Sequence, residues 1–272
     1  MKISVITVCF NEEKNIGMTL NSVLRQKSVD YELIICDGNS SDRTVEIAES
    51  YKPLFAEKGV DYIIKSEKDG GIYYGMNKGI DMAKGDYVIF MNAGDCFHGN
   101  DAISNIVEGV ESAGYLPDIV YGDAIFVERG YYEIRKAAPI DTMDQGMPFF
   151  HQSVLVRTDL IKENKFDTSF KIVADFDMFS KFYTQKRSFY YVETIISDFY
   201  AGGISCMKQK ETAKESFRVR DKYGFKYNKA EIEKKVSKGE FLAKVKSGMP
   251  GFLWKLWCIR KKRKKASELN NQ

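Results

Sequence analysis

The sequence has few of the side chains that build the commonest metal sites and proton relays. Among its 272 residues only His98 and His151 are histidines, so a histidine-rich metal site is excluded and a histidine-dependent relay must use one of these two. The five cysteines are scattered, odd in number and form no C-x-x-C pair. This pattern argues against a disulfide framework or a zinc site and favours a reducing compartment.

Long apolar runs are also missing. Residues 1–10 are apolar, but Asn11, Glu12 and Glu13 follow at once and leave too short a segment for a signal peptide. No run approaches the ~18 apolar residues of a membrane-spanning helix. We therefore expect a cytoplasmic protein.

Outside the C-terminal end the sequence has no large excess of positive or negative charge. The formal net charge is +3, but residues 260–272 hold six Lys or Arg and one Glu, a net +5, which leaves −2 for residues 1–259. The basic character is therefore local, and we expect no nucleic-acid partner for the body of the protein.

The first hundred residues repeat a pattern of strand, polar loop and helix. Expected strands cover residues 2–9, 31–36, 62–65 and 87–91, and a segment with apolar residues at helical spacing follows each of the first three. Such alternation predicts an α/β fold with a parallel sheet and right-handed crossovers.

Each of these strands ends in a loop with carboxylates or amides. The loop residues are Asn11 and Glu12, Asp37, Asp69, and Asn92 with Asp95. Because the carboxyl ends of neighbouring parallel strands meet at one edge, these side chains should line one crevice. The loops lack G-x-G-x-x-G and G-x-x-x-x-G-K-[ST], so the common ways of holding phosphate are absent. A crevice of carboxylates needs a divalent cation to hold a diphosphate, and Asp95 offers the hard oxygens that Mg²⁺ or Mn²⁺ prefers.

Four segments in the correct order and spacing resemble family 2 glycosyltransferases, which have the GT-A fold and include enzymes of bacterial surface polysaccharide synthesis. They are Thr7-Val-Cys-Phe-Asn11, Ile34-Ile-Cys-Asp-Gly-Asn-Ser-Ser-Asp42, Asp69-Gly-Gly-Ile-Tyr-Tyr-Gly-Met-Asn-Lys-Gly79 and Ala83-Lys-Gly-Asp-Tyr-Val-Ile-Phe-Met-Asn-Ala-Gly-Asp95. The resemblance covers roughly the first hundred residues and continues more weakly to Ser205.

The resemblance implies a GT-A domain over residues 1–206, with a nucleotide-sugar-binding half (1–100) and an acceptor-binding half (101–206), followed by a helical extension (207–272). The implied activity is inverting transfer of a sugar from a nucleotide diphosphate sugar, with a UDP-sugar favoured, to a hydroxyl of a glycan or lipid-linked acceptor. Mn²⁺ or Mg²⁺ is the implied cofactor.

The family's motifs also assign residues. Asp37 corresponds to the carboxylate that contacts the nucleotide base, Asp69 to a second nucleoside contact, and Asp95 to the cation ligand. The full implied donor-binding set is Thr7, Cys9, Asn11, Glu12, Asp37, Asp69, Asn77, Asn92, Ala93, His151 and Gln152. Gly38 and Asn92 stand where the family often has Asp; an amide carries no charge, so Asn92 is the weaker candidate ligand.

An inverting transfer needs a base for the acceptor hydroxyl. The segment Val173 to Phe182 has a helical pattern that begins with Asp175, which matches the family's acidic helix start, with Ala174 in place of the frequent Glu. Asp175 is the candidate base and Asp177 the alternative. Asp is favoured in a first helical turn whatever its function, and a lone histidine such as His151 is as often packed as functional.

The C-terminal segment combines apolar and cationic residues. Residues 252–259 are rich in apolar side chains, including Trp254 and Trp257, and six basic residues follow directly. This combination predicts contact of residues 252–265 with the inner leaflet of the cell membrane, and so a peripheral protein on its cytoplasmic face. The alternatives are a helix that packs its Trp residues on the body and, third, a nucleic-acid-binding tail.

Two other functions are compatible with this sequence. A sugar nucleotidyltransferase would share the metal, the nucleotide and a similar sheet, but it would need a basic phosphate-binding loop where Asn11, Glu12 and Glu13 stand. A catalytically silent scaffold subunit of a glycan-assembly complex would use the tail alone.

Overall fold

The computed structural model describes residues 1–27 and 30–269, with side chains up to residue 261. A mixed nine-stranded sheet runs through the centre of the chain. Its strands are β1 (Ile3–Cys9), β2 (Tyr31–Asp37), β3 (Asp61–Ser66), β4 (Tyr87–Phe90), β5 (Cys96–Phe97), β6 (Ile119–Glu128), β7 (Tyr131–Arg135), β8 (Val154–Arg157) and β9 (Phe189–Tyr200).

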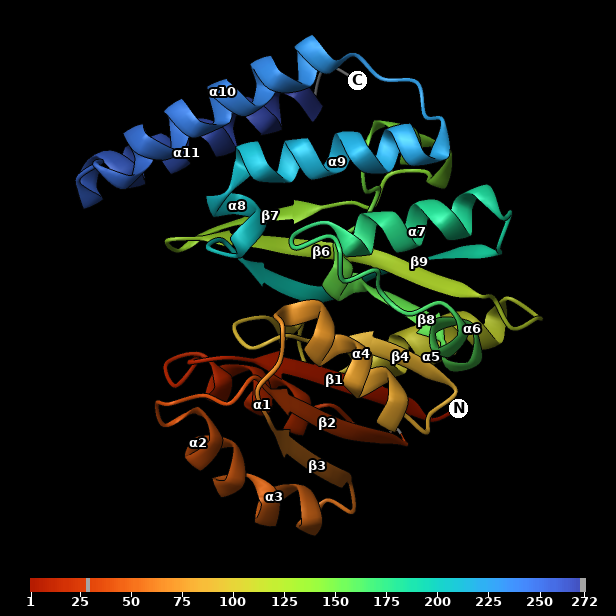
Figure 1. Cartoon of the computed structure of the whole chain (residues 1–272). Coiled ribbons are helices and arrows are strands. Elements are labelled where there is room, and N and C mark those ends of the chain that lie inside the picture. The colour runs from red at the N-terminus through yellow and green to blue at the C-terminus, as the bar shows by residue number, and fades with distance from the viewer. Residues whose placement is uncertain (28–29, 270–272) are drawn as a thin grey trace.

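The strands are arranged in the order β3-β2-β1-β4-β8-β6-β9-β5, with β7 paired to β6. The first four strands in this order are parallel to one another, as the repeated pattern of the sequence predicts. Strand β8 is antiparallel to both β4 and β6 and so joins the two halves of the chain, while β6 and β9 are parallel. Because these four strands are parallel, their carboxyl ends lie at the same edge of the sheet (Figure 1).

Helices cover both faces of the sheet (Figure 1). The helices are α1 (Ile16–Leu24), α2 (Thr44–Ser50), α3 (Lys52–Glu57), α4 (Ile72–Met82), α5 (Ala102–Ser112), α6 (Thr158–Glu163), α7 (Ala174–Thr184), α8 (Ile204–Met207), α9 (Gln209–Tyr223), α10 (Lys229–Ser247) and α11 (Gly251–Leu269), with short 3₁₀-helices η1 (Ile140–Gln145) and η2 (His151–Ser153).

Strand β1 shows why both faces need covering, since every one of its residues is buried. Ile6 and Val8 point into an apolar core shared with α4, α6 and α7, whereas Ile3 and Val5 point into a second core shared with α1, α3 and α5. Successive side chains of a strand face opposite sides, so a strand with apolar side chains on both faces must be covered by helices on both. The prediction of an α/β fold is confirmed.

Two glycines bring α4 close to the sheet. A Cβ on Gly79 would lie 2.4 Å from Ile6 Cγ2, and one on Gly75 would lie 2.8 Å from Val8 Cγ1. The spacing of four residues places both glycines on the face of the helix that contacts β1. The glycines of the third family-like segment therefore fix the distance between α4 and the strand.

The helical segment that follows the second strand is interrupted. Pro53 stands at the start of α3, where its missing N–H costs nothing, but within one continuous helix it would remove a hydrogen bond. The chain therefore forms α2 and α3, separated at Tyr51.

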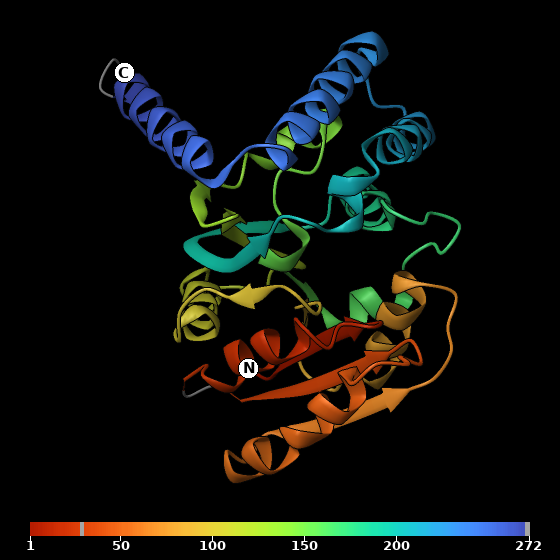
Figure 2. The same ribbon diagram turned by 90° about the vertical axis from the view of Figure 1, so that its left-hand side faces the viewer.

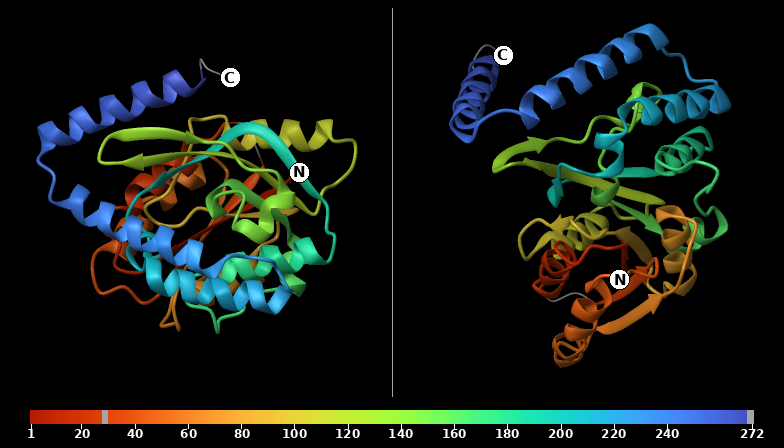
Figure 3. Two further views of the ribbon diagram at one scale, coloured as in Figure 1. Left: turned by 90° about the horizontal axis from the view of Figure 1, so that it is seen from above. Right: turned by 60° about the vertical axis from the view of Figure 1, so that its left-hand side comes forward.

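The C-terminal helices lie at the end of the molecule opposite β3 (Figure 3). Helix α9 contacts α7, and α10 and α11 diverge from each other like the arms of a V (Figure 2). Within the described residues, no helix has the length and apolar character that crossing a bilayer requires. The division of the chain at residue 206 stays a prediction.

Candidate active site

Asp37, at the end of β2, is buried and organises the loops around it. Its carboxylate accepts hydrogen bonds from the backbone N–H of Ser40 (2.9 Å) and from the hydroxyls of Ser40 and Ser66 (2.5 Å for Ser66). The Cys9 thiol lies 3.6 Å from the same carboxylate, and burial raises the pKa of that thiol. Asp37 therefore joins the ends of β1, β2 and β3, and its contact with a nucleotide base stays a prediction.

Asp69 and Phe10 meet at Gly38. A Cβ on Gly38 would lie 3.3 Å from the ring of Phe10 and 3.6 Å from Asp69 Oδ1. Asp69 also accepts the N–H of Gly71 at 2.9 Å, at the start of α4. Phe10 is 60% exposed although it is aromatic. Glycine at position 38 thus places no side chain between an exposed ring and a carboxylate, and the nucleoside contact expected of Asp69 stays a prediction.

Two polar residues after β1 hold the neighbouring loops. Asn11 has a positive φ of 54° and its side-chain oxygen accepts the Ser41 N–H at 2.9 Å. The backbone N–H of Glu12 donates to Thr44 Oγ1 at 2.7 Å. Thr7 lies deeper in β1, with a buried hydroxyl that has no partner among the described residues.

The segment Asn92 to Asp95 forms a tight turn after β4. The N–H of Asp95 donates to the carbonyl of Asn92 at 2.9 Å, and Gly94 adopts a φ of 102°, which other residues rarely adopt. Thr19 of α1 stabilises the turn through its hydroxyl, which accepts the N–H of Gly94 (3.0 Å) and donates to the carbonyl of Asp95 (2.7 Å). Ala93 is fixed by its own N–H, which donates to Val8 at 3.1 Å.

Asp95 is 8% exposed, and its carboxylate meets the second half of the chain. Gln152 Nε2 donates to Asp95 Oδ2 at 2.7 Å, and the N–H of Tyr200 also bonds the carboxylate. Burial raises the pKa of Asp95 to about 7, against the lowering effect of these two donors, and the nearby charge of Glu12 raises it further. A buried carboxylate near unpaired oxygens is an environment that a cation would stabilise.

The donor atoms at this turn fit a divalent cation. The side-chain oxygen of Asn92 is buried and has no hydrogen-bond partner among the described residues. Within the same part of the chain, no group of three or more His, Cys, Asp or Glu side chains could hold a metal. A single carboxylate with one amide oxygen is a donor set that suits Mg²⁺ or Mn²⁺, which take further oxygens from water and substrate phosphates.

His151 is buried beside the Asp95 contact. Its ring stacks on Phe90 at 5.1 Å, and neither ring nitrogen has a partner among the described residues. Burial lowers the pKa of His151, while the charge of Asp175 acts in the opposite direction. The imidazole packs between β4 and α7, since its ring also lies 6.4 Å from that of Phe179.

Asp175 lies in the first turn of α7, facing α4. Its Oδ1 accepts the N–H of Phe176 at 2.8 Å and lies 3.3 Å from the hydroxyl of Tyr73. The Tyr73 hydroxyl also donates to the carbonyl of Ile172 at 2.7 Å. No basic side chain forms an ion pair with Asp175 among the described residues.

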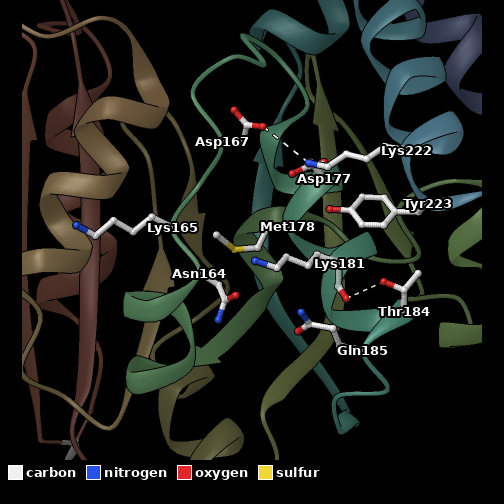
Figure 4. A pocket seen from close by; sticks show the side chains of 10 residues that line it. All are labelled: Asn164, Lys165, Asp167, Asp177, Met178, Lys181, Thr184, Gln185, Lys222 and Tyr223. Atoms are coloured by element: carbon white, nitrogen blue, oxygen red, sulfur yellow. Dashed lines mark hydrogen bonds and ion pairs between the residues drawn. The ribbon is translucent and has the colours of Figure 1, made fainter.

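Asp177 faces the opposite way, toward α9. It is 5% exposed and pairs with Lys222 Nζ at 2.7 Å. This pair lines one side of a cavity of about 490 Å³ between the segment after α6, α7 and α9, and Figure 4 shows the residues around it. Because its carboxylate is held by a lysine on the other side of the helix, Asp177 is poorly placed to replace Asp175.

Asn77 joins two segments of the protein. Its amide donates to the carbonyl of Phe166 (3.0 Å) and accepts the N–H of the same residue (2.9 Å). These contacts connect α4 to the loop before α7, and a donor-binding role for Asn77 stays a prediction.

Sequence reasoning missed Thr19 and Tyr73, which shape the turn of Asp95 and the start of α7. Thr19 is fully buried on the apolar face of α1, with Ile16 and Val23, and a polar residue at such a helical spacing among apolar ones is the sequence signal that could have found it. Tyr73 stands inside the third family-like segment but was not singled out there.

The structure divides the apolar residues of the C-terminal tail into two groups. Trp254 is 4% exposed, stacks on Trp257 at 4.9 Å and donates its indole N–H to the carbonyl of Arg129 in the β6–β7 hairpin at 3.0 Å. Trp257 packs on Tyr131 of the same hairpin. The prediction that both Trp residues serve as membrane anchors is therefore wrong for Trp254, which packs on the body. Other apolar side chains around the α10–α11 turn are exposed: Phe241, Leu242, Val245, Phe252, Leu253, Leu256 and Ile259.

Solved structures with similar folds are known. A structure of Staphylococcus aureus TarS 1–349 in complex with UDP-GlcNAc superposes with a TM-score of 0.62 at 16% identity, over 88% of this chain and 71% of that one. The mannosyltransferase PcManGT from Pyrobaculum calidifontis, in complex with GDP-Man and Mn²⁺, has a TM-score of 0.61 at 13% identity, over 96% and 79% of the two chains. At this identity the likeness concerns the fold, and it confirms the expected GT-A arrangement.

Sequence relatives are also known. A PGL/p-HBAD biosynthesis glycosyltransferase of Mycobacterium bovis is 28% identical over 176 residues, which cover 64% of this chain and 66% of the relative. The poly(ribitol-phosphate) beta-N-acetylglucosaminyltransferase TarP of Staphylococcus aureus is 30% identical over 223 residues, covering 73% and 64%. The chain thus spans just under two thirds of the length of these relatives. The model of the family described as Glycosyl transferase family 2 matches residues 4–189, and the chain therefore belongs to that family.

Proposed function

We propose that the protein transfers a sugar from a nucleotide diphosphate sugar to a hydroxyl of a glycan or lipid-linked acceptor, with inversion, in the synthesis of a cell-surface glycan. The contact that carries the proposal is the 2.7 Å bond from Gln152 to Asp95, since it joins the donor-side crevice to the half of the chain that holds Asp175. The ligands named for similar structures, UDP-GlcNAc and GDP-Man with Mn²⁺, support a nucleotide sugar as donor.

In this proposal one carboxylate would bind the cation and a second acts as the base. Asp95, with the side-chain oxygen of Asn92 in the same turn, would hold Mg²⁺ or Mn²⁺, and a bound cation offsets the charge of the departing nucleoside diphosphate. Asp175 accepts the proton of the acceptor hydroxyl. As that oxygen bonds the anomeric carbon, the bond from this carbon to the diphosphate oxygen breaks, and its electron pair leaves with the diphosphate. Attack from the opposite face inverts the configuration.

The neighbouring groups prepare this reaction. Phe10 and Asp69, separated by Gly38, form the nucleoside side of the crevice. Both ring nitrogens of His151 lack a partner among the described residues, and one of them would bond a donor hydroxyl or phosphate oxygen.

A thermal-shift screen tests the proposal. UDP, UDP-GlcNAc, GDP and GDP-Man are added with and without Mn²⁺, and at least one nucleotide should raise the melting temperature only when the cation is present. Asp95→Ala should abolish this shift. Asp175→Asn should keep the shift but stop release of the nucleoside diphosphate from the stabilising sugar nucleotide. If no nucleotide stabilises the protein, or Asp175→Asn turns over at the unmutated rate, the proposal or the base assignment is wrong.

We also propose that an anionic lipid surface is the partner of the α10–α11 elbow, defined here as residues 241–259. The exposed apolar side chains of both helices gather beside their turn, and Phe252 and Leu256 are 66% and 59% exposed. From Phe241 to Ser267 the sequence has nine Lys or Arg and no Asp or Glu. A protein partner would meet this surface with acidic residues, but exposed apolar chains among cations also fit a bilayer with acidic headgroups.

The packing of α11 gives this surface a fixed position. The stacked Trp pair and the ion pairs Lys246 to Glu128 (2.6 Å) and Lys261 to Glu133 (3.1 Å) attach both helices to the β6–β7 hairpin. The elbow is therefore held on the acceptor half of the chain, which suits an acceptor carried by a lipid.

Vesicle sedimentation tests this partner. The protein should pellet with phosphatidylcholine vesicles that contain roughly 30% phosphatidylglycerol, and less with phosphatidylcholine alone, because each basic residue near an anionic surface contributes about 1 kcal/mol. Phe252→Ser combined with Leu256→Ser should release the protein, whereas Leu116→Ser, at an exposed leucine far along the chain, should not. Equal binding by the double variant, or a concentration-dependent dimer that the double variant abolishes, would instead assign the elbow to another partner or to a second copy of the chain.

A further inference from the structure

Helix α7 has no capping side chain of its own. Its N-cap is Val173, whose side chain has no oxygen to accept the free N–H groups of the first turn. Asp175, the candidate base, stands two residues further on. The N–H groups of residues 171–173, which lead into this turn, have their acceptor in another part of the chain.

Glu215 of α9 supplies that acceptor. Its two carboxylate oxygens accept the N–H of Lys171 (2.9 and 3.1 Å), and one of them also accepts the N–H groups of Ile172 (2.9 Å) and Val173 (3.2 Å). Glu215 forms no ion pair with a described basic side chain. A single carboxylate thus binds three successive backbone donors, an arrangement that is strong because the acceptor is charged.

The opposite side of the same segment is held by α4. The Tyr73 hydroxyl donates to the carbonyl of Ile172 at 2.7 Å and lies 3.3 Å from Asp175 Oδ1. Residues 171–173 are therefore clamped between α4 and α9. Because α4 is seated on β1 through Gly75 and Gly79, one side of the clamp is fixed to the sheet.

Helix α9 is itself held firmly. Arg220 is 5% exposed and its guanidinium donates to the carbonyls of Asp144 (3.2 Å) and Gln145 (2.9 Å) in η1. Lys222 pairs with Asp177 of α7 at 2.7 Å. These contacts keep Glu215 at a constant distance from the start of α7.

We propose that Glu215 is a positioning residue for Asp175: through the backbone of residues 171–173 it fixes the first turn of α7 and so the direction of the candidate base. Its role in catalysis rests on the proposed function, whereas its role in ordering the segment does not. On this proposal α9, which follows residue 206, is part of the catalytic unit.

Hydrogen–deuterium exchange tests the ordering without any substrate. In Glu215→Gln, which keeps the shape but replaces the charge by an amide, the amides of residues 171–173 should exchange about tenfold faster, because their charged acceptor is lost. The amides of β1 and β2 should be unaffected. In Glu215→Asp, which retains the charge on a shorter side chain, the exchange rate of these amides should lie between those of the unmutated protein and of Glu215→Gln. This variant replaces Glu215→Gln in the test if the latter does not fold. Glu211→Gln, an exposed residue of the same helix, is the matched control. Unchanged exchange at residues 171–173 in both variants would overturn the proposal.

Steady-state kinetics test the link to Asp175. With UDP-GlcNAc, UDP-Glc and GDP-Man as probes, Glu215→Gln should lower kcat by about 10- to 100-fold, because misplacement of a catalytic group by about 1 Å has effects of this size. KM for the donor and the thermal shift with nucleotide should change less than about twofold, since the donor loops lie elsewhere. A loss in KM with unchanged kcat would overturn the positioning role. If the unmutated protein turns over none of the probes, the proposed function fails, and the exchange data still decide whether Glu215 orders the segment.

Discussion

The buried carboxylate of Asp95 should make the stability of the metal-free protein depend on pH. Its pKa is raised from 3.8 to about 7, mainly by burial. Between these values the folded state holds a proton that the unfolded state has lost, so the free energy of unfolding falls as the pH rises. The contribution is fully present below pH 3.8 and is lost as the pH passes 7. A shift of about 3 pH units corresponds to about 4 kcal/mol.

The substitution Asp95→Asn isolates this effect, because asparagine does not titrate and still offers an oxygen to Gln152. At pH 8 the variant should be at least as stable as the unmutated protein. On going to pH 5 the unmutated protein should gain about 2.7 kcal/mol relative to the variant, that is about 1.36 kcal/mol for each of the two pH units below 7. Urea unfolding, followed by far-ultraviolet circular dichroism in EDTA, measures the difference at each pH.

Asp141→Asn is the control, since Asp141 is exposed and its substitution should give no trend of this size. The reasoning is refuted if the difference between Asp95→Asn and the unmutated protein stays constant from pH 8 to pH 5. That result would mean that the carboxylate is hydrated and titrates at its ordinary pH. At pH 8, saturation with Mn²⁺ and the stabilising nucleotide should make the unmutated protein more stable than Asp95→Asn, because these ligands favour the ionised carboxylate.

Two further substitutions test the packing that supports the site. Gly79→Ala should destabilise the protein by about 1–3 kcal/mol in urea unfolding, because the new methyl group would lie 2.4 Å from Ile6. The control Gly17→Ala in α1, where no atom is closer than 3.5 Å, should be neutral or stabilising. Equal effects of the two substitutions would show that α4 moves freely on β1. Trp254→Ala should release α11 from the β6–β7 hairpin and so speed tryptic cleavage within residues 251–265. Phe252→Ala, which changes an exposed side chain of the same helix, should not. Equal cleavage of both variants would mean that α11 is not held by Trp254.

The first half of the fold could be predicted because its information is local. Strands β1 to β4 are short apolar runs separated by polar loops, and no observed bound differs from the expected one by more than one residue. The second half depends on contacts that a sequence pattern does not contain. Strand β5 has two residues and forms only because β9 pairs with it, and neither it nor β7 was predicted.

The site shows the same division. Asp37, Asp69 and Asp95 were found because each follows its own strand, where local sequence identifies it. Glu215, which accepts the backbone N–H groups of residues 171–173, lies some 40 residues beyond them in the sequence and stands in a charged run whose solvated and buried members look alike. Trp254 was interpreted from its neighbours in sequence, but its environment is set by the β6–β7 hairpin, more than a hundred residues earlier.

The place of β8 in the sheet bears on the synthesis of the chain. Strand β4, whose four residues are all buried, has β1 on one side and the later strand β8 on the other. While a ribosome adds the roughly 65 residues between them, a few seconds at about 5–20 residues per second, β4 is an unpaired apolar edge. Fragments that end near residue 100 should therefore aggregate, and a nascent chain would need its edge protected until β8 emerges. The strand that brings Gln152 to Asp95 is thus also the strand that closes the sheet.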